Sequence, residues 1–257
     1  MIRAYRSEWQ KLMRRGMFLC AALMAGAASL GAVVGISRAR AGGEGAFTLA
    51  RLAQSDGFFQ IMTRAGDLIA IVALGVMATV VASEYQHSTL RNLLVRQPDR
   101  VRLLAGKLLA GVTWLALTLA AATTAALLAA VATAPTRGLD VSAWFGSSGL
   151  VHLVDAYGDT MLQGIGFGLV GAAIAQALRS VAPAIVGGFV LLFPIEALLV
   201  LAWSQLGAWL PGGALTAIGS GGNDVLPYTH ALMGAAMWVG GMTLVAALVF
   251  RRRDVVA

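Results

Sequence analysis

Six long apolar stretches dominate the pattern of hydrophobic and polar positions along the chain. None alternates with a period of two, and each is long enough to cross about 30 Å of hydrocarbon as a helix. A backbone in lipid has no water to bond, so spanning segments must be helices or closed barrels, and continuous apolarity favours helices. The stretches cover residues 17–37, 65–83, 103–133, 156–178, 183–203 and 231–250. We therefore predict an all-α integral membrane protein with six transmembrane helices, forming a single transmembrane domain over residues 1–257.

The composition of the 257-residue chain supports lipid as its main solvent. Hydrophobic residues make up 58% and charged residues only 12% of the chain, against about 25% charged residues in ordinary soluble domains. These values exclude a soluble fold, a disordered chain and a disulfide-rich secreted domain. The first apolar stretch is too long for the apolar region of a typical signal peptide, so we expect it to be retained as a span.

Positive charges predict how the six spans are oriented. The net charge is +7, with nineteen Lys and Arg against twelve Asp and Glu. Fourteen of the nineteen fall in the two terminal segments and in the connections after the second and fourth spans. The other connections hold Arg38, Arg40, Arg51, Arg64 and Arg137. Cytoplasmic segments carry the excess of positive charge, so both termini should be cytoplasmic in the inner or plasma membrane. This bias explains the basic composition without a nucleic-acid partner.

Two segments outside the six stretches are too apolar for free loops. Residues 1–15 place apolar side chains on one helical face and basic ones around it, which is typical of an interfacial helix on the cytoplasmic leaflet. Residues 204–230, between spans five and six, include Trp209, Leu215 and Ile218. We expect this segment to lie at the outer interface or to dip back into the protein. The first outer connection, residues 38–64, is rich in Gly and Ala and could hold a short amphipathic helix.

The connection between spans two and three predicts a further amphipathic helix. Leu90, Leu93 and Leu94 fall on one helical face, and Pro98 ends the helix because the residue before a proline is pushed out of the helical region. A helix held between two spans can transmit force from a soluble partner. The same pattern is also typical of a helix held on the membrane surface by acidic lipid, and the residues alone leave both interpretations open.

Three motifs give the chain a likeness to a known family. They are residues 7–12 (SEWQKL), the set Glu84-Tyr85, 88–94 (STLRNLL), Pro98, Arg100 and Gly106-Lys107, and residues 250–255 (FRRRDV). With its six-span spacing, the chain resembles the permease subunits of ABC-2 type ABC transporters. Ser88 stands where that family commonly has Gly, which exchanges one small residue for another.

The resemblance implies a set of partners and contacts. Permeases of this family work as homodimers or pseudo-dimers, and each engages a separate ATPase subunit that carries ATP and Mg. The helix after the second span is their coupling helix, which docks in a groove of the ATPase, and a partly inserted external hairpin lies between spans five and six. Carried over to this sequence, the coupling residues are Glu84, His87, Thr89, Leu90, Arg91, Leu93, Leu94 and Arg96.

The chain itself shows no motif for ATP hydrolysis or metal binding. Residues 105–108 (AGKL) resemble the end of a phosphate loop, but Val101 and Leu108 occupy the places of the required Gly and Ser or Thr. His87, His152 and His230 lie far apart in the sequence and form no ligand spacing. We therefore expect no catalytic site, bound cofactor or metal in this chain, and ATP hydrolysis on the partner subunit.

Acidic residues inside the predicted spans are candidates for the transport pathway, because a carboxylate at mid-bilayer costs roughly 2.5–3.5 kcal/mol. Glu196 lies well inside span five, shortly after Pro194. It either lines the pathway or makes a buried hydrogen bond. Asp67 and Asp159 lie near the outer ends of spans two and four, where structural or capping roles are favoured; Asp67 remains a second pathway candidate.

With the resemblance, the sequence predicts a permease subunit that exports an amphiphilic substrate, such as a drug, an antibiotic peptide or a lipid. Transport would follow alternating access, powered by a separate ATPase subunit and shared with a second permease copy or homologue in the lipid membrane. Two alternatives stay open. One is a proton-coupled secondary transporter using Glu196 or Asp67, and the other is a membrane scaffold that transports nothing.

Overall fold

The computed structural model describes residues 2–40, 47–86 and 99–252. Helices form the regular structure of these residues, apart from an isolated bridge between Arg40 and Thr48. Six helical segments are long and apolar enough to cross a membrane, which confirms the prediction of an all-α membrane protein with six spans. The spans are α2 (Arg15–Arg38), α4 (Gly57–Gln86), α6 (Arg100–Thr133), α7 (Ser147–Leu178), the pair α8 (Val181–Val190) and α9 (Glu196–Ala202), and α11 (Tyr228–Arg252).

Two spans begin more than a full helical turn before the residue that the hydropathy pattern predicts. Helix α4 starts at Gly57 rather than at residue 65, and α7 starts at Ser147 rather than at residue 156. The extra turns carry polar residues such as Gln60 and His152. Hydropathy detects only the part of a helix that is apolar enough for hydrocarbon, so it ends a span where the helix continues among polar groups.

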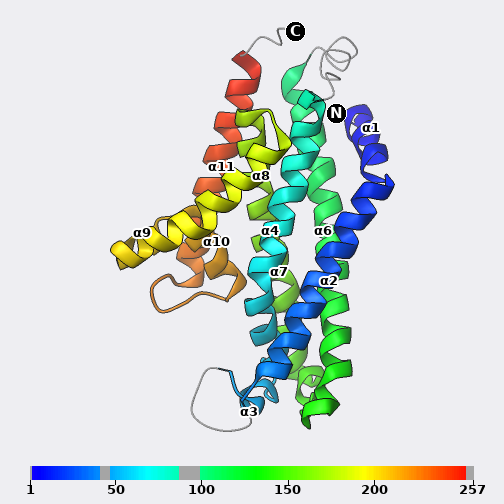
Figure 1. Ribbon diagram of the computed structural model, residues 1–257, viewed down its shortest axis with the longest axis vertical. Helices are drawn as coiled ribbons and strands as arrows, with labels where there is room; N and C mark the ends of the chain where they lie inside the picture. Colours follow the sequence, from blue (N-terminus) through cyan, green and yellow to red (C-terminus); the bar gives the residue numbers. More distant parts are fainter. Residues whose placement is uncertain (1, 41–46, 87–98, 253–257) are drawn as a thin grey trace.

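Helix α4 lies at the centre of the bundle, between α2, α6 and α7 (Figure 1). Helices α4 and α7 approach closely because Gly171 has no side chain; a Cβ there would lie 2.5 Å from the Leu74 carbonyl oxygen. Likewise, a Cβ on Gly31 of α2 would lie 2.8 Å from the Cβ of Ala65 on α4. Small residues at these positions therefore serve packing within the chain, as they do in many membrane bundles.

The fifth span is interrupted at its centre. A π-helical segment, η3 (Leu191–Ile195), joins α8 to α9 and contains Pro194. Proline has no N–H to donate and its ring clashes with the preceding turn, so the regular hydrogen-bond ladder cannot pass through it. Beyond this point α9 leans away from the bundle (Figure 1).

The segment between the fifth and sixth spans folds into two short helices, η4 (Ser204–Ala208) and α10 (Pro211–Gly219). Leu215 and Ile218 of α10 are buried in a cluster shared with α7 and α11. Trp209, in contrast, is largely exposed. The segment is therefore packed on the protein, and its insertion into a membrane remains a prediction.

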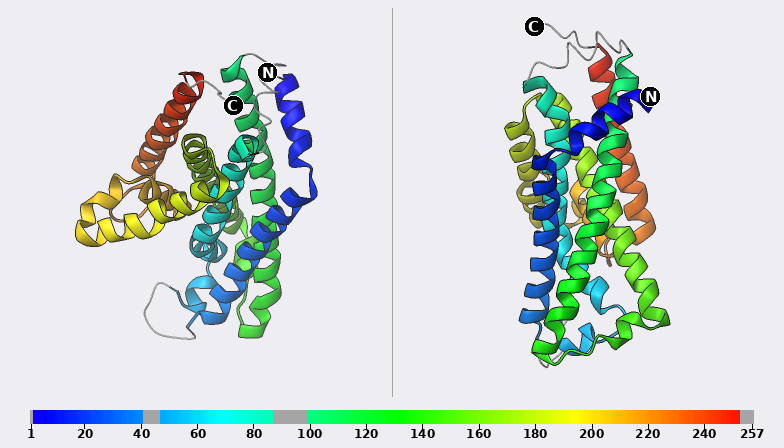
Figure 2. Two further views of the ribbon diagram at one scale, coloured as in Figure 1. Left: turned by 45° about the horizontal axis from the view of Figure 1, so that its top comes forward. Right: turned by 90° about the vertical axis from the view of Figure 1, so that its right-hand side faces the viewer.

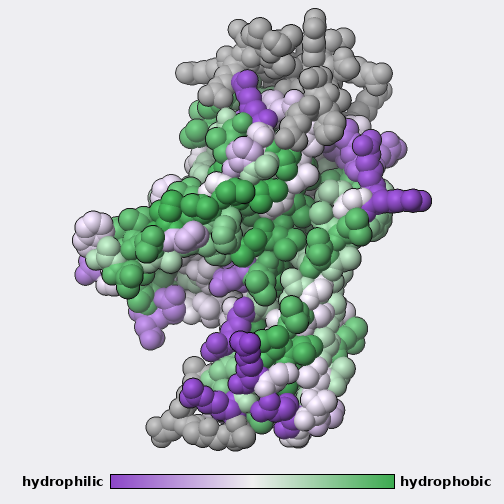
Figure 3. Space-filling model, in the orientation of Figure 1, coloured by the Kyte–Doolittle hydropathy of each residue, from purple (hydrophilic) through white to green (hydrophobic). Residues whose placement is uncertain are grey.

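Apolar side chains cover much of the outer surface. Leu19, Leu23 and Leu201 are all more than 60% exposed, and the space-filling view shows broad hydrophobic areas over the middle of the molecule with hydrophilic groups toward its lower end (Figure 3). A soluble protein rarely exposes such surface, whereas a protein solvated by lipid does. The N-terminal helix α1 (Ile2–Leu12) and the end of α11 lie at the same end of the molecule (Figure 1).

Candidate functional site: a buried cluster of four charges

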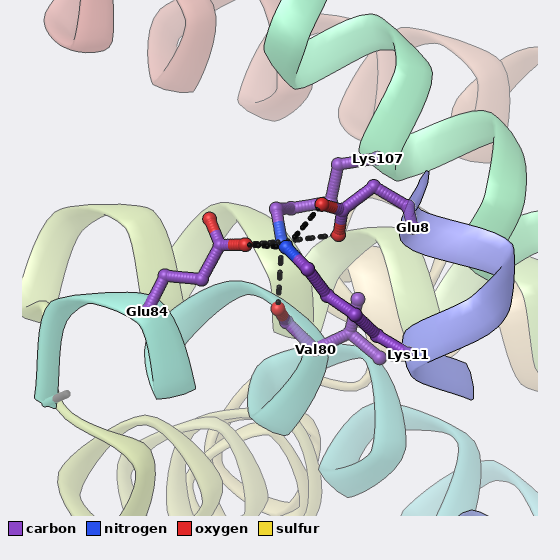
Figure 4. Close-up of polar contacts among 5 residues, drawn as sticks. All are labelled: Glu8, Lys11, Val80, Glu84 and Lys107. Carbon is purple, nitrogen blue, oxygen red and sulfur yellow. Dashed lines mark hydrogen bonds and ion pairs between the residues drawn. The ribbon is translucent and has the colours of Figure 1, made fainter. Parts of the chain in front are cut away.

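Four charged side chains from three helices meet near the end of the molecule that carries α1 (Figure 4). Glu8 and Lys11 belong to α1, Glu84 to α4 and Lys107 to α6. The Lys107 Nζ atom lies 2.7 Å from a Glu8 carboxylate oxygen and 2.8 Å from Glu84 Oε1. The Lys11 ammonium group lies 2.7 Å from the same Glu84 oxygen and also pairs with Glu8. Each lysine thus contacts both glutamates, and the four formal charges cancel.

Local helix geometry brings these groups to one place. Glu8 and Lys11 are three residues apart, so they lie on the same face of α1. On α4, the Val80 carbonyl lies one turn before Glu84 and accepts a further hydrogen bond from Lys107 at 3.3 Å. The apolar residue Leu12 of α1 is buried with Val76 of α4 and with residues of α6, which holds α1 against the two spans.

Three of the four side chains of the cluster are almost completely shielded from solvent, whereas the Lys11 side chain is 36% exposed. Glu8, Glu84 and Lys107 are 3%, 6% and 5% exposed. Charges at such depth are costly unless they are paired, and removing one partner leaves another charge uncompensated. An ion cluster of this kind is weak evidence of stability, but its ion pairs between different helices join α1, α4 and α6 at one point.

The pKa values of the α1 residues reflect this pairing. Burial alone would raise the pKa of Glu8, but the charge and hydrogen bond of Lys107, assisted by Lys11, outweigh burial and lower it. Burial alone would lower the pKa of Lys11, but hydrogen bonds and charge from Glu8 and Glu84 raise it. Both shifts favour the charged forms.

The cavity that the described residues form beside the cluster is small. It is lined by Glu84, Tyr85 and Lys107 among others and holds about 10 Å³, which is no more than one water molecule needs. Within the described part of the chain, the arrangement is therefore a joint between helices.

The cluster lies at both ends of the predicted coupling segment. Glu84 is in the last turn of α4, and Lys107 is in the second turn of α6. Of the predicted coupling residues, Glu84 alone belongs to the described part of the chain, and its carboxylate faces Lys11 and Lys107. The others lie outside the described residues: His87, Thr89, Leu90, Arg91, Leu93, Leu94 and Arg96.

The sequence interpretation did not assign roles to Glu8, Lys11 or Lys107. A signal was nevertheless present, because each belongs to one of the first two motifs that carry the family resemblance. Neighbouring contacts extend the same joint: the Gln176 amide donates a hydrogen bond to the Tyr85 hydroxyl at 2.5 Å, and the Arg179 guanidinium lies 5.8 Å from the Tyr85 ring centre.

The two pathway candidates lie in different surroundings. Glu196 is buried, and its two carboxylate oxygens accept hydrogen bonds of 3.1 Å from the backbone N–H groups of Gly212 and Gly213. These donors belong to the first turn of α10, whose N–H groups have no partner within the helix. Glu196 thus makes a buried hydrogen bond, one of the two roles that the sequence left open. Asp67 is exposed on α4, and no hydrogen bond or ion pair joins it to Glu196.

Asp159 of α7 has a structural partner at the start of the last span. Its carboxylate accepts a hydrogen bond of 2.5 Å from the hydroxyl of Tyr228, at the start of α11. This bond ties α7 to α11, in keeping with the structural role that the sequence favours.

Comparison with known proteins places the chain in a family. The family model described as "ABC-2 family transporter protein" matches residues 4–154, more than half of the chain. The match includes most of α1, the first three spans and all four residues of the charge cluster. No curated protein matches the sequence. On this evidence the chain belongs to the ABC-2 family of transporter proteins.

Proposed function

We propose that this chain is the permease subunit of an ABC transporter whose separate ATPase subunit binds ATP and Mg and drives the permease through residues 87–98. The observation that supports the proposal best is the charge cluster, which joins α1, α4 and α6 next to both attachment points of that segment. The sequence shows no motif for ATP hydrolysis, so the energy for transport is proposed to come from the ATPase subunit.

A displacement of the segment that connects two spans moves the transmembrane bundle only when the spans on either side are held firmly against their neighbouring helices. In the charge cluster, sliding one helix past another would break ion pairs between buried groups of different helices, at a cost in free energy. A displacement of residues 87–98 would therefore carry the ends of α4 and α6 together, and α1 with them through Glu8. Because α1 leads directly into α2, the first span would follow.

The transported substrate is proposed to be amphiphilic and exported by alternating access, with a second permease copy completing the pathway. Two pockets at the end of the molecule away from α1 support an amphiphilic substrate class. One pocket, of about 560 Å³, combines leucine and valine with arginines, and the other, of about 430 Å³, combines aromatic rings with aspartates. Sites that bind amphiphiles pair apolar walls with a few polar groups in this way.

The test is reconstitution with the candidate ATPase that co-purifies with the chain. Arg91→Glu places a negative charge in the proposed docking segment, so we expect permease-stimulated ATPase activity and transport to fall by about tenfold or more, while the variant still inserts in the membrane. Arg14→Glu makes the same charge change outside that segment and should keep both activities. Full stimulation in Arg91→Glu would contradict docking, and transport that needs no ATPase but stops with a proton uncoupler would contradict the proposed class.

A further inference from the structure

Three arginines surround one pocket between α2 and α4. Arg38 is the last residue of α2, Arg40 lies just beyond that helix, and Arg64 lies on α4; all three line the pocket of about 560 Å³. The walls below them are apolar and include Leu30, Val34 and Leu68, which are exposed side chains of the two spans. Basic groups at one end of an apolar groove match the shape of a lipid, with its charged headgroup and hydrocarbon chains.

These arginines differ from the other two arginines of the predicted outer segments. Arg137 caps the end of α2, because its guanidinium donates hydrogen bonds to the carbonyl oxygens of Ser37 and Ala39. Arg51 forms an ion pair of 3.1 Å with Asp56. Among the described residues, the ion pairs include none that involves an arginine of the pocket.

The pocket holds its arginines in a defined arrangement. The Arg64 guanidinium lies 4.2 Å from the ring centre of Phe47, which covers its face, and within the described residues no ion pair engages its N–H groups. The backbone of Arg40 is bound to that of Phe47 and Leu49. The guanidinium fork suits phosphate oxygens, which it can bind with two parallel hydrogen bonds.

We infer that this pocket binds an anionic phospholipid, with the phosphate headgroup held by Arg38, Arg40 and Arg64 and an acyl chain lying along Leu30, Val34 and Leu68. The charge of the pocket selects the headgroup, and its apolar wall continues directly into the lipid-facing surface of α2. The binding requires no ATPase partner, so it can be tested whether or not the proposed function holds; it deepens that proposal in one respect, because the same pocket supports an amphiphilic substrate.

The test measures lipid contact at the pocket directly. Cys20 is the single cysteine of the sequence, so a Cys20→Ala, Leu68→Cys chain carries one fluorescent label at the pocket wall. The labelled protein is placed in nanodiscs that contain chain-brominated phosphatidylglycerol or chain-brominated phosphatidylcholine at equal fractions. We expect the anionic lipid to quench the label with an apparent affinity roughly five- to tenfold higher than the zwitterionic lipid.

Variants separate the pocket from general surface charge. Combined Arg38→Gln, Arg40→Gln and Arg64→Gln should reduce the affinity ratio to about one, and the single variants Arg38→Gln and Arg64→Gln should reduce it partly if the triple variant does not fold. Arg51→Gln removes an arginine outside the pocket and should keep the ratio. The site would be refuted if Arg51→Gln lowered the affinity ratio as much as the pocket variants do, or if the pocket variants left the affinity ratio unchanged.

Two further results would also refute it. Absence of quenching by either lipid would mean that protein, such as a second copy, covers this face. Equal quenching of the unaltered pocket by both lipids would mean that the arginines select no anion. Equal quenching would also follow if a carboxylate of the chain neutralised the pocket arginines. The acidic residue Glu44 belongs to residues 41–46, which lie outside the described part.

Discussion

Lys107 and Glu8 form an ion pair of 2.7 Å between side chains that are 99 residues apart in the sequence, and both are almost completely buried. The pair connects the N-terminal helix to the third span. Because Lys107 also contacts Glu84, a single ammonium group holds three helices together at the point where residues 87–98 join the bundle.

Replacing Lys107 should therefore strongly destabilise the folded protein. In Lys107→Met, Glu8 and Glu84 lose their most buried partner and one of them remains uncompensated, which should lower the free energy of unfolding by about 3–5 kcal/mol. Arg102→Met removes a positive charge from the same helix, but that side chain is 70% exposed, so its cost should stay within about 0.5 kcal/mol. Denaturant unfolding in detergent micelles measures both values.

A double variant distinguishes charge balance from lost packing. Lys107→Met combined with Glu8→Gln leaves the neutral pair Lys11–Glu84 in place. If uncompensated charge causes the loss, the double variant should be less destabilised than the sum of the two single variants. Strict additivity would show that the four charges do not act as one unit.

The spans could be predicted from the sequence, whereas the cluster could not. Helix existence follows from local hydropathy, so all six spans were found, although the polar first turns of α4 and α7 were missed. The pairing of Glu8 with Lys107 depends on how three helices pack, and no periodicity along the chain encodes it. The same holds for Glu196, whose partners Gly212 and Gly213 lie on a different helix.

Acid should release α1 from the bundle. The pKa of Glu8 is lowered in the folded protein, because the attraction of Lys107 and Lys11 outweighs the opposing effect of burial. A lowered carboxyl pKa contributes stability above its ordinary value of about 4.3, and this contribution is lost as the pH falls through the folded value. The thermal unfolding midpoint of the unaltered protein should therefore fall as the pH is lowered from 7 to 3. The midpoint of Glu8→Gln should fall less over the same range. Identical profiles for the two proteins would contradict this assignment.

Lys11 sets the alkaline limit of the pH range in which the charge cluster stabilises the protein. Its pKa is raised, because its bonds to Glu8 and Glu84 outweigh the effect of burial, so its contribution is present below its ordinary value of about 10.4 and disappears as the pH rises through the folded value. The cluster should consequently be most stable between these two ordinary values.

Glu196 should act as a cap for α10. In Glu196→Ala, the N–H groups of Gly212 and Gly213 lose their acceptor in a buried place, at a cost of about 1–3 kcal/mol, and amide hydrogen exchange in α10 should accelerate. Glu196→Gln keeps one oxygen acceptor and should retain most of the protection. If Glu196 instead carries protons or lines the pathway, Glu196→Gln would stop transport while exchange in α10 stayed unchanged.

The close approach of α4 and α7 can be tested with two glycines of one helix. A Cβ at Gly171 would lie 2.5 Å from the backbone oxygen of Leu74, whereas a Cβ at Gly158 would meet nothing within 4 Å. Gly171→Ala should force the two helices apart and destabilise the protein by about 1–3 kcal/mol. Gly158→Ala should be neutral or stabilising by up to about 1 kcal/mol, because alanine loses less backbone entropy in a helix. Thermal unfolding of the two variants in the same lipid measures the difference. Since α4 also carries Glu84, a displaced α4 should weaken the charge cluster, so Gly171→Ala but not Gly158→Ala should lower the coupling energy between Lys107 and Glu84.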